Sequence, residues 1–408
     1  MATPLLPAAY FAATSTAPWL LLRAARAAHL RQNAPVARLP ERFGEATQQR
    51  PKGKLIWLHA ASVGEVQSAA ALAPYLAAHA TLLVTTSTQT GAERAAQVLP
   101  EGCIHQFQPV DTARAVSSFL SHWQPDLALF VEGDLWPRMC RNLARRGTPA
   151  ALLNARASKS RARFPRSYGY MLAPFRLITC QTEAVRAGLM ALGLPSDRLR
   201  CLGDLKADLP AASISESALD AFQTAAKGRP VWAAVSTHPA DEAHVLAAHR
   251  ALLTNAPDAL LLWLPRHPAR AEAIRAAADG LGLSQRSQGE APTEKTQILL
   301  ADTLGEAGAA FATASTVFLG GGFGREGGHN PYEPAKAGAF VLSGPKVNNF
   351  SAAYARLAVD GFTELVADTA TLTEALSSRL SKPHQPPWQG SETNAAVATI
   401  DALAAYLP

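Results

Sequence analysis

The sequence is poor in charged residues for a protein of this length. Charged residues make up 17% of its 408 residues, whereas hydrophobic residues make up 48%. Disordered chains carry many charges and few apolar residues, so this composition excludes general disorder. A single hydrophobic core stops growing near about 250–300 residues, and we therefore expect two domains.

Cysteine is also scarce. The four cysteines are Cys103, Cys140, Cys180 and Cys201, and no two of them form a C-x-x-C pair. We expect reduced, structural thiols and a cytosolic compartment. The histidine-rich stretch that begins at Thr237 and His238 has no HExxH pattern and no cysteine companion, so we expect no metal site there.

The sequence lacks a long uninterrupted hydrophobic run. Residues Met1–Leu22 carry no charged side chain, but prolines interrupt them and alanine and threonine dilute them. A spanning helix needs about 20 strongly apolar residues. We expect residues 1–35 to lie on the inner leaflet of a membrane, with a spanning helix as the less favoured alternative. A secretory cleavage site is missing, which argues against secretion.

Acidic residues are absent from one basic stretch, which we call the basic block. The block contains Arg138, Arg141, Arg145, Arg146, Arg156, Lys159, Arg161, Arg163 and Arg166. Such a run attracts phosphates, on nucleic acid or on lipid headgroups, although a solvated surface is the simpler explanation for any single arginine. For the block as a whole we favour a polyanionic partner.

Short apolar runs alternate with alanine-rich helical stretches along the whole chain. The expected strands are Leu55–His59, Thr81–Thr85, Leu127–Val131, Ala150–Asn154, Leu177–Gln181, Arg200–Gly203, Val231–Ser236, Leu260–Pro265, Gln297–Ala301, Thr316–Gly320, Phe340–Ser343 and Thr363–Val366. Helices are expected at Val66–His79 and Asp241–Thr254. The repeated units predict an α/β fold of two Rossmann-like, doubly wound domains, as in GT-B glycosyltransferases.

The strand pattern pauses near the middle of the chain, at the polar stretch Leu209–Ser217. We place a domain junction there, between a first domain of residues 36–210 and a second domain of residues 211–408. The expected C-terminal helix, Thr393–Tyr406, is assigned to the second domain. Ligands of such folds bind at the carboxyl ends of the strands, so we expect the site in the cleft between the domains.

The strongest local motif is VFLGGGFGREGGHNPYE, from Val317 to Glu333. A strand leads into a glycine stretch and then into a helix start, and the candidate ligand-binding residues are Gly321, Gly322, Asn330, Pro331, Tyr332 and Glu333. Glycine lets the backbone approach a ligand, and a helix N-terminus attracts phosphate. The alternative is that Glu333 only caps the helix and that the glycines only make turns.

Two further polar clusters follow strands of the second domain. Arg266 and His267 follow one strand, where an arginine suits a phosphate. The turn Leu304, Gly305 and Glu306 follows another, although an ordinary capped helix explains it equally well.

Polar residues also follow the strands of the first domain. Glu65 lies in the motif Ser62-Val63-Gly64-Glu65, where a carboxylate suits proton abstraction from a hydroxyl, or simply stabilises the first turn of a helix. Glu132, Arg156 and Lys206 stand at three further strand ends, and a lysine there suits stabilisation of negative charge.

In this order, the motifs resemble the Kdo (3-deoxy-D-manno-octulosonic acid) transferase family. They include WLHAASVGE, EGDLWP, LLNARAS, GDLKAD, PRHPAR, DTLGE and GGHNPYEP. The resemblance implies a GT-B enzyme that moves Kdo, with inversion, from CMP-Kdo to a lipid A precursor in lipopolysaccharide biosynthesis. It places the enzyme at the cytoplasmic face of the inner membrane, with no cofactor or catalytic metal.

The resemblance also implies roles for individual residues. Glu65 is the general base, and Glu132 and Lys206 stabilise the transition state. CMP is bound by Arg266, His267, Leu304-Gly305-Glu306 and Asn330 to Glu333. Ser62, Gly64, Arg156, Arg161 and Arg163 are expected on the acceptor or membrane side.

The sequence departs from the family pattern at a few positions. Gly133-Asp134 replaces Thr-Glu, Arg138 replaces Asn, Phe323-Gly324 replaces Ser-Leu and Tyr332 replaces Leu. Two other functions stay open. Another GT-B enzyme, an epimerase or UDP-sugar transferase, would share the fold. A nucleic-acid-binding protein would explain the basic block but not the second-domain motifs, so we expect no nucleic-acid partner.

Overall fold

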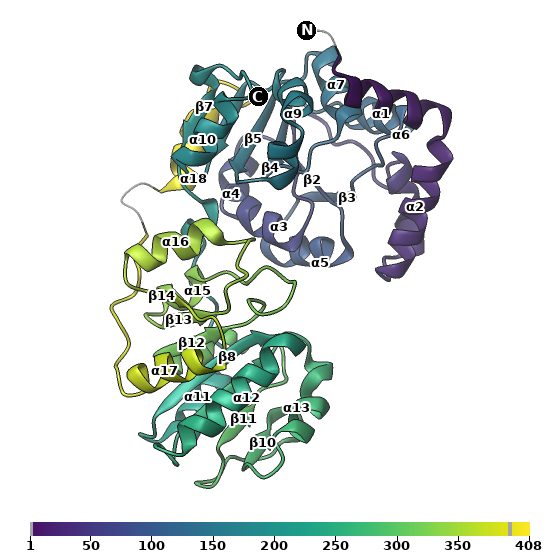
Figure 1. The fold of residues 1–408 in the computed structure, drawn as a ribbon. Helices are drawn as coiled ribbons and strands as arrows, with labels where there is room; N and C mark the ends of the chain where they lie inside the picture. Colours follow the sequence, from purple (N-terminus) through teal and green to yellow (C-terminus); the bar gives the residue numbers. More distant parts are fainter. Residues whose placement is uncertain (1–2, 391–393) are drawn as a thin grey trace. The chain divides into compact units, whose positions relative to one another are not determined.

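The computed structural model describes residues 3–390 and 394–408, which divide into two compact units. Unit 1 holds residues 3–209 and 394–408, and unit 2 holds residues 210–390 (Figure 1). The expected assignment of the C-terminal helix to the second domain is wrong. Helix α18 (Ala395–Leu403) belongs to unit 1, because its apolar side chains join the core beneath the first sheet and its Ala396 N–H donates to Asp208. Thr393 lies outside the described residues.

Unit 1 contains a parallel seven-stranded sheet in the order β3-β2-β1-β4-β5-β6-β7. Its strands are β1 (Leu55–His59), β2 (Thr81–Thr86), β3 (Ile104–Phe107), β4 (Leu127–Val131), β5 (Ala150–Ala155), β6 (Leu177–Cys180) and β7 (Leu199–Cys201). Along β1, Leu55 and Trp57 enter one core cluster, whereas Ile56 and Leu58 enter the other. Both faces of the sheet are therefore covered, which is why these strands are continuous apolar runs.

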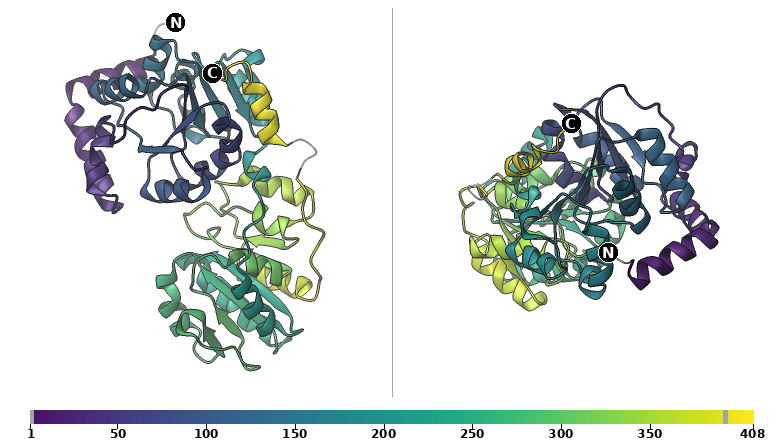
Figure 2. Two further views of the ribbon diagram at one scale, coloured as in Figure 1. Left: turned by 180° about the vertical axis from the view of Figure 1, so that it is seen from behind. Right: turned by 90° about the horizontal axis from the view of Figure 1, so that it is seen from above.

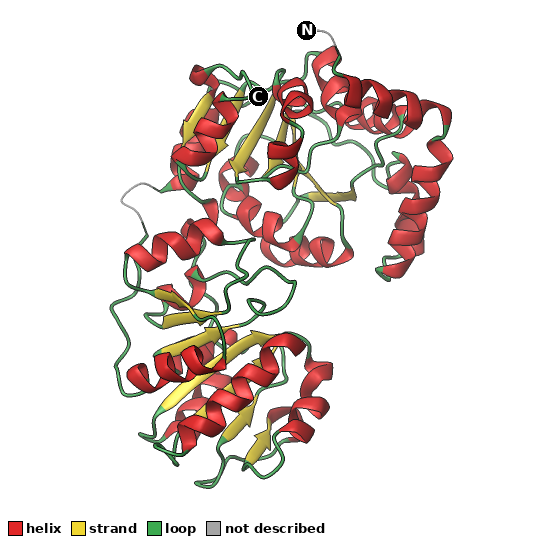
Figure 3. Ribbon diagram, in the orientation of Figure 1, coloured by secondary structure: helices red, strands yellow, loops and turns green. Residues whose placement is uncertain are grey.

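Unit 2 repeats the plan with the parallel order β10-β11-β9-β8-β12-β13-β14. Its strands are β8 (Val231–Thr237), β9 (Leu260–Pro265), β10 (Leu283–Gln285), β11 (Ile298–Leu300), β12 (Thr316–Leu319), β13 (Phe340–Ser343) and β14 (Thr363–Leu365). Ala233 and Val235 of β8 face one core cluster, and Trp232 and Ala234 face the other. The α/β, doubly wound fold predicted from the sequence is confirmed (Figure 3).

Helices connect the strands and flank both sheets. In unit 1 they are α1 (Leu5–Thr16), α2 (Pro18–Arg31), α3 (Val63–Ala70), α4 (Ala73–Ala77), α5 (Gln89–Val98), α6 (Ala113–Trp123), α7 (Pro137–Arg146), α8 (Lys159–Arg163), α9 (Pro165–Leu172), α10 (Glu183–Met190) and α18, with the 3-10 helices η1 (Val36–Phe43), η2 (Ser196–Arg198) and η3 (Leu205–Asp208). In unit 2 they are α11 (Glu216–Ala226), α12 (Pro239–Leu253), α13 (Ala271–Ala277), α14 (Ala307–Thr313), α15 (Tyr332–Lys336), α16 (Ser351–Val359) and α17 (Thr369–Arg379), with η4 (Pro268–Arg270) and η5 (Arg286–Gln288).

All expected strands are present, with ends shifted by at most two residues. The sequence analysis missed β3 and β10, which are short strands at the edges of the two sheets and include polar residues. The helix expected at Val66–His79 is two helices, α3 and α4, and the second begins beside Pro74, which lacks the N–H that a continuous helix needs.

The N-terminal helices α1 and α2 lie on the outside of unit 1, as the purple helices of Figure 2 show. Within the described part of the chain, no single helix has the length and apolar composition of a membrane span. Taken together, α1 and α2 meet those criteria, but the chain bends by 83° between them.

Each sheet has one central pair of strands whose following strands lie on opposite sides of the pair, β1 and β4 in unit 1 and β8 and β12 in unit 2. The connections after two such strands diverge to opposite sides, which leaves a crevice at their carboxyl ends. Functional residues are therefore expected directly after these four strands.

Candidate functional site

The carboxyl of Glu65 lies at the start of α3, just after β1. It is buried, and its Oε2 accepts the N–H of Ala61, so it does cap the helix start. Burial raises the pKa of Glu65 to about 7, the negative charges of Glu132 and Asp134 add to the rise, and His59 and the Ala61 N–H oppose it. A carboxyl with this pKa exchanges a proton near neutral pH, as a general base requires.

Glu132 follows β4 and is held by two cations. Lys206 Nζ lies 2.5 Å from its Oε1, and Arg156 Nε lies 2.9 Å from its Oε2. Ser68 of α3 also donates to Oε1, at 3.1 Å. Glu132 and Lys206 are buried, so this ion pair is desolvated, whereas the Arg156 side chain is 38% exposed. Such a cluster stabilises an anion that develops beside it.

The backbone around this cluster is bent into an uncommon conformation. Glu132 and Asn154 both have a positive φ, of 60° and 57°, directly at the ends of β4 and β5. Non-glycine residues seldom adopt this conformation, and such strain clusters at functional sites. The Asn154 side chain bonds Asp204 at 3.1 Å and accepts the Leu205 N–H at 3.1 Å, which fixes η3, the turn that carries Lys206.

A histidine–carboxylate pair, which the sequence analysis did not identify, joins the same strand ends. His59 is the last residue of β1, and its Nε2 lies 3.1 Å from Asp134 Oδ2. Burial opposes ionisation of Asp134, but hydrogen bonds from His59, Trp136 and Ser87 outweigh it and lower the pKa of Asp134. Asp134 therefore places a fixed negative charge near Glu65, which helps to raise the pKa of that carboxyl.

Of the other residues expected on the acceptor side, two lie near the start of α3 and two belong to the basic block. Ser62 is the N-cap of α3 but makes no capping hydrogen bond, and a Cβ on Gly64 would lie 3.7 Å from Lys206 Nζ. Arg163 is exposed and stacks on Phe164. Arg161 is buried and donates to the Arg156 carbonyl, which excludes it from an outer surface.

The basic block therefore needs a correction, because not all of its residues face outward. Arg138 is also buried, and it donates to Thr14 Oγ1 at 2.6 Å and to the carbonyl of Phe11 and the hydroxyl of Ser15, each at 2.5 Å. This arginine fastens α1 to α7. The exposed basic residues of the block are Arg145, Arg146, Lys159, Arg163 and Arg166.

In unit 2, Asp241 organises the glycine stretch that follows β12. Its carboxylate accepts the N–H of Gly321 at 2.7 Å, of Phe323 at 3.2 Å and of His238 at 2.9 Å. The Gly321 N–H is therefore already used within the protein. Gly322 serves close packing, since a Cβ there would lie 2.6 Å from the Gly344 nitrogen.

Three histidines gather beside this loop. His238 and His329 stack with their Nε2 atoms 3.0 Å apart, and the ring of His267 lies 5.7 Å from that of His238. Burial lowers the pKa of His329 to about 4, and His238 and Arg266 lower it further. Arg266 and His267 are exposed and follow β9, and Arg266 supplies a positive charge beside this cluster. His329 was missed as a site residue, although it stands inside the glycine motif.

The remaining residues that the sequence analysis predicted to bind the nucleotide have different surroundings in the structure. Asn330 accepts the Tyr332 N–H and donates to Glu333 at 3.3 Å, so it shapes the start of α15, while Pro331 is the N-cap. Tyr332 is buried and stacks on Trp388. Glu306 pairs with Arg286 at 2.6 Å, whereas Leu304 and Gly305 are exposed. Tyr332 and Glu306 thus have structural partners, which a ligand contact would have to accommodate.

We found no group of three or more His, Cys, Asp or Glu able to hold a metal ion in residues 3–390 and 394–408. The four cysteines are free.

Replacing Asp241 with alanine should loosen the glycine loop. The change leaves three backbone N–H groups without their acceptor, and an unsatisfied buried donor costs about 1–3 kcal/mol. We expect Asp241→Ala to lower the melting temperature and to weaken nucleotide binding in calorimetry. The control is Asp220→Ala, an exposed acid on α11 of the same unit. Equal behaviour of the two variants would contradict this role.

Sequence comparisons identify the family of the chain. The family model described as "3-Deoxy-D-manno-octulosonic-acid transferase (kdotransferase)" matches residues 37–209. A 3-deoxy-D-manno-octulosonic acid transferase of Haemophilus influenzae is 33% identical over 361 residues, which are 84% of this chain and 83% of that protein. The enzyme of the same name from Bordetella pertussis is 32% identical over 405 residues, covering 90% and 91%.

Among solved structures, the UDP-GlcNAc 2-epimerase of Methanocaldococcus jannaschii aligns with a TM-score of 0.59, covering 86% of this chain and all of that one. Its sequence identity is only 12%, so the likeness shows the GT-B-like fold alone. The sequence relatives decide what the fold leaves open: the chain belongs to the family of Kdo transferases and is a glycosyltransferase of lipopolysaccharide biosynthesis.

Proposed function

We propose that this enzyme transfers Kdo from CMP-Kdo to a lipid A precursor, with Glu65 as the general base. The observation that carries the proposal is the buried Glu65 carboxyl with a pKa of about 7 near the Lys206–Glu132–Arg156 ion cluster. A proton acceptor and two nearby cations together suit the attack of a hydroxyl on a sugar whose leaving group is an anion.

The reaction follows from these two features. Glu65 removes the proton of an acceptor hydroxyl as its oxygen forms a bond to the anomeric carbon of Kdo. The bond from that carbon to the phosphate oxygen of CMP breaks, and CMP leaves as an anion. Attack from the side opposite the leaving group inverts the anomeric centre. The cations Lys206 and Arg156 stabilise negative charge in the transition state.

Unit 2 is proposed to bind the nucleotide. The glycine loop that Asp241 holds, the three histidines and Arg266 lie at the carboxyl ends of the central strands, where folds of this class bind nucleotides. Arg266 is suited to pair with the phosphate of CMP, because a guanidinium matches phosphate oxygens.

Donor choice separates this proposal from the epimerase alternative. The purified enzyme is given a lipid A precursor with either CMP-Kdo or a UDP-sugar, and release of the free nucleotide is followed. We expect CMP release that depends on the acceptor, and no turnover of the UDP-sugar. Acceptor-independent turnover of a UDP-sugar would favour an epimerase.

We also propose that the enzyme works at the cytoplasmic face of the inner membrane, held there by α1, α2 and the exposed part of the basic block. Leu5 is 86% exposed and Trp19 is 58% exposed, so both helices present apolar side chains outward. In unit 1, α1 packs on α7, α7 on α9 and α9 on α8, which makes the apolar helices neighbours of the basic ones. Apolar and basic signals together hold a protein on an anionic bilayer.

Reversing three exposed arginines should release the enzyme from anionic vesicles. Each basic side chain near the surface contributes about 1 kcal/mol, so the triple variant Arg145→Glu, Arg163→Glu and Arg166→Glu should bind about 100-fold more weakly or worse. Co-sedimentation at low and high salt measures this. The control reverses three exposed lysines of unit 2, Lys227, Lys295 and Lys382. Equal sedimentation of both variants and of wild type would show that the basic block is an ordinary solvated surface.

A further inference from the structure

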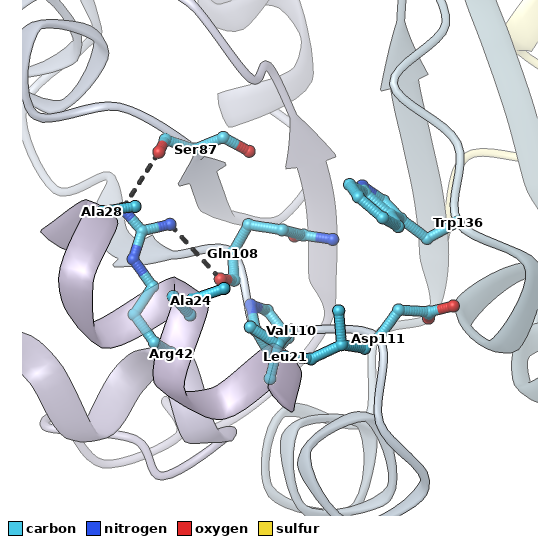
Figure 4. Close-up of a pocket in the computed structure, with 11 residues that line it drawn as sticks. Leu21, Ala24, Ala28, Arg42, Ser87, Gln108, Val110, Asp111 and Trp136 are labelled. Atoms are coloured by element: carbon cyan, nitrogen blue, oxygen red, sulfur yellow. Dashed lines mark hydrogen bonds between the residues drawn. The ribbon is translucent and has the colours of Figure 1, made fainter. Parts of the chain in front are cut away.

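A pocket of about 310 Å³ in unit 1 lies between α2 and the loop that follows β3 (Figure 4). Helix α2 lines one wall with Leu21, Ala24, Ala25 and Ala28, which recur at the spacing of a single helix face. Figure 4 shows Val110 and Trp136 among the other lining side chains. The small alanine side chains leave room that larger residues would fill.

The polar groups around the pocket are already engaged within the protein. The Arg42 guanidinium donates to the carbonyl oxygens of Ser87, at 3.0 Å, and Gln108, at 3.5 Å. The Asp111 carboxylate accepts two backbone N–H groups at the start of α7, at 2.8 and 2.9 Å. The pocket therefore offers mainly methyl groups and rings to a ligand, and it suits a hydrocarbon better than a charged or strongly polar molecule.

The pocket borders the His59–Asp134 pair of unit 1. Two of its lining residues, Ser87 and Trp136, hydrogen-bond the Asp134 side chain, with Ser87 Oγ at 3.4 Å. Asp134 pairs with His59, and its charge acts on Glu65. A molecule in the pocket would therefore contact residues that hydrogen-bond Asp134, whose charge acts on the proposed base Glu65.

We propose that this pocket binds a segment of one acyl chain of the lipid acceptor, so that α2 is a wall of the acceptor site. This inference rests on the proposed function. The volume lies at the lower end of the about 300–1,000 Å³ range of ligand pockets, which fits part of a chain rather than a whole lipid. On its outer side α2 exposes Trp19 and Leu20, so the helix that would touch the bilayer also lines the pocket.

The test compares an acylated lipid A precursor with its deacylated, water-soluble counterpart, using CMP-Kdo as donor. Ala25→Phe fills the pocket, and each methylene it excludes lowers affinity about fourfold. If three methylenes are excluded, the ratio of kcat/KM for the acylated over the deacylated acceptor should fall about 60-fold. The matched control, Ala77→Phe, places the same side chain at an exposed position of α4, which is part of neither the pocket nor the proposed membrane surface, and it should leave this ratio unchanged.

A second measurement uses the wild-type enzyme and does not depend on the folding of a variant. An acceptor with a photoreactive group in its acyl chain is crosslinked, and the labelled peptide is found by mass spectrometry. Labelling of residues 21–28 supports the proposal. If Ala25→Phe leaves the ratio of kcat/KM unchanged, or if only residues outside 21–28 are labelled, the acyl-chain proposal is overturned. The proposed transfer reaction is not affected by either result. Failure of wild type to modify either acceptor removes the proposed function itself, and the acyl site with it.

Discussion

Glu65→Gln is expected to lower kcat by about 10²–10⁴-fold, the usual contribution of a general base. Glutamine keeps the size of the side chain and an oxygen that can accept the Ala61 N–H, so the cap at the start of α3 survives. Binding of CMP should not change, because the substitution lies in unit 1. Near-normal turnover at saturating acceptor would mean that Glu65 only caps the helix.

The pH dependence gives an independent check of the same residue. Because burial raises the pKa of Glu65 to about 7, kcat should rise as the pH increases through 7 and the carboxyl loses its proton. The same raised pKa has the opposite effect on folding stability, which should fall as the pH rises. A carboxyl whose pKa is higher in the folded than in the unfolded protein loses its stabilising contribution as the pH rises through the folded value. Glu65→Gln should therefore melt no lower than wild type at pH 8, and a large fall in melting temperature would contradict this account.

Lys206→Met should cost both stability and activity. It leaves the buried Glu132 carboxylate without its buried cationic partner, and breaking a buried pair costs about 3–5 kcal/mol. For a domain of this size we expect the melting temperature to fall by about 6–20 °C. Removal of one charge that stabilises the transition state should also lower kcat by about 10²–10³-fold.

Arg156→Met is the matched control, since it removes the second cation from the same carboxylate. The Arg156 side chain is 38% exposed, so water screens this pair and its loss should cost about 1 kcal/mol or less. Thermal melts and steady-state kinetics of both variants measure the difference. Equal losses in the two variants would contradict the view that burial makes Lys206 the decisive partner.

The sheets could be predicted because buried parallel strands are continuous apolar runs bounded by polar residues. The strands around Leu55–His59 and Leu127–Val131 are examples. The site could be predicted in part for the same reason. Glu65 and Glu132 follow β1 and β4, and the sheet order makes those two strands neighbours. A polar residue directly after an apolar run is a signal that needs no knowledge of packing.

Contacts between distant segments could not be predicted from a local pattern. His59 looked like the end of a strand, and its link to Asp134 depends on the pairing of β1 with β4. The sequence pattern around Arg138 predicted a surface charge, but in the structure its side chain is buried against α1. Tyr332 resembled a ligand contact within the glycine motif, but Trp388, far along the chain, stacks on its ring. Hydrophobic periodicity carries no information on such partners.

The most direct test of the central claim is the mass of the product. Wild-type enzyme and Glu65→Gln are incubated with CMP-Kdo and a lipid A precursor, and the lipid is analysed by mass spectrometry. We expect wild type to add Kdo to the lipid while CMP is released, and the variant to leave the lipid almost entirely unmodified while it still binds CMP. Unmodified lipid with the wild-type enzyme, or equal Kdo addition by both proteins, would contradict the account.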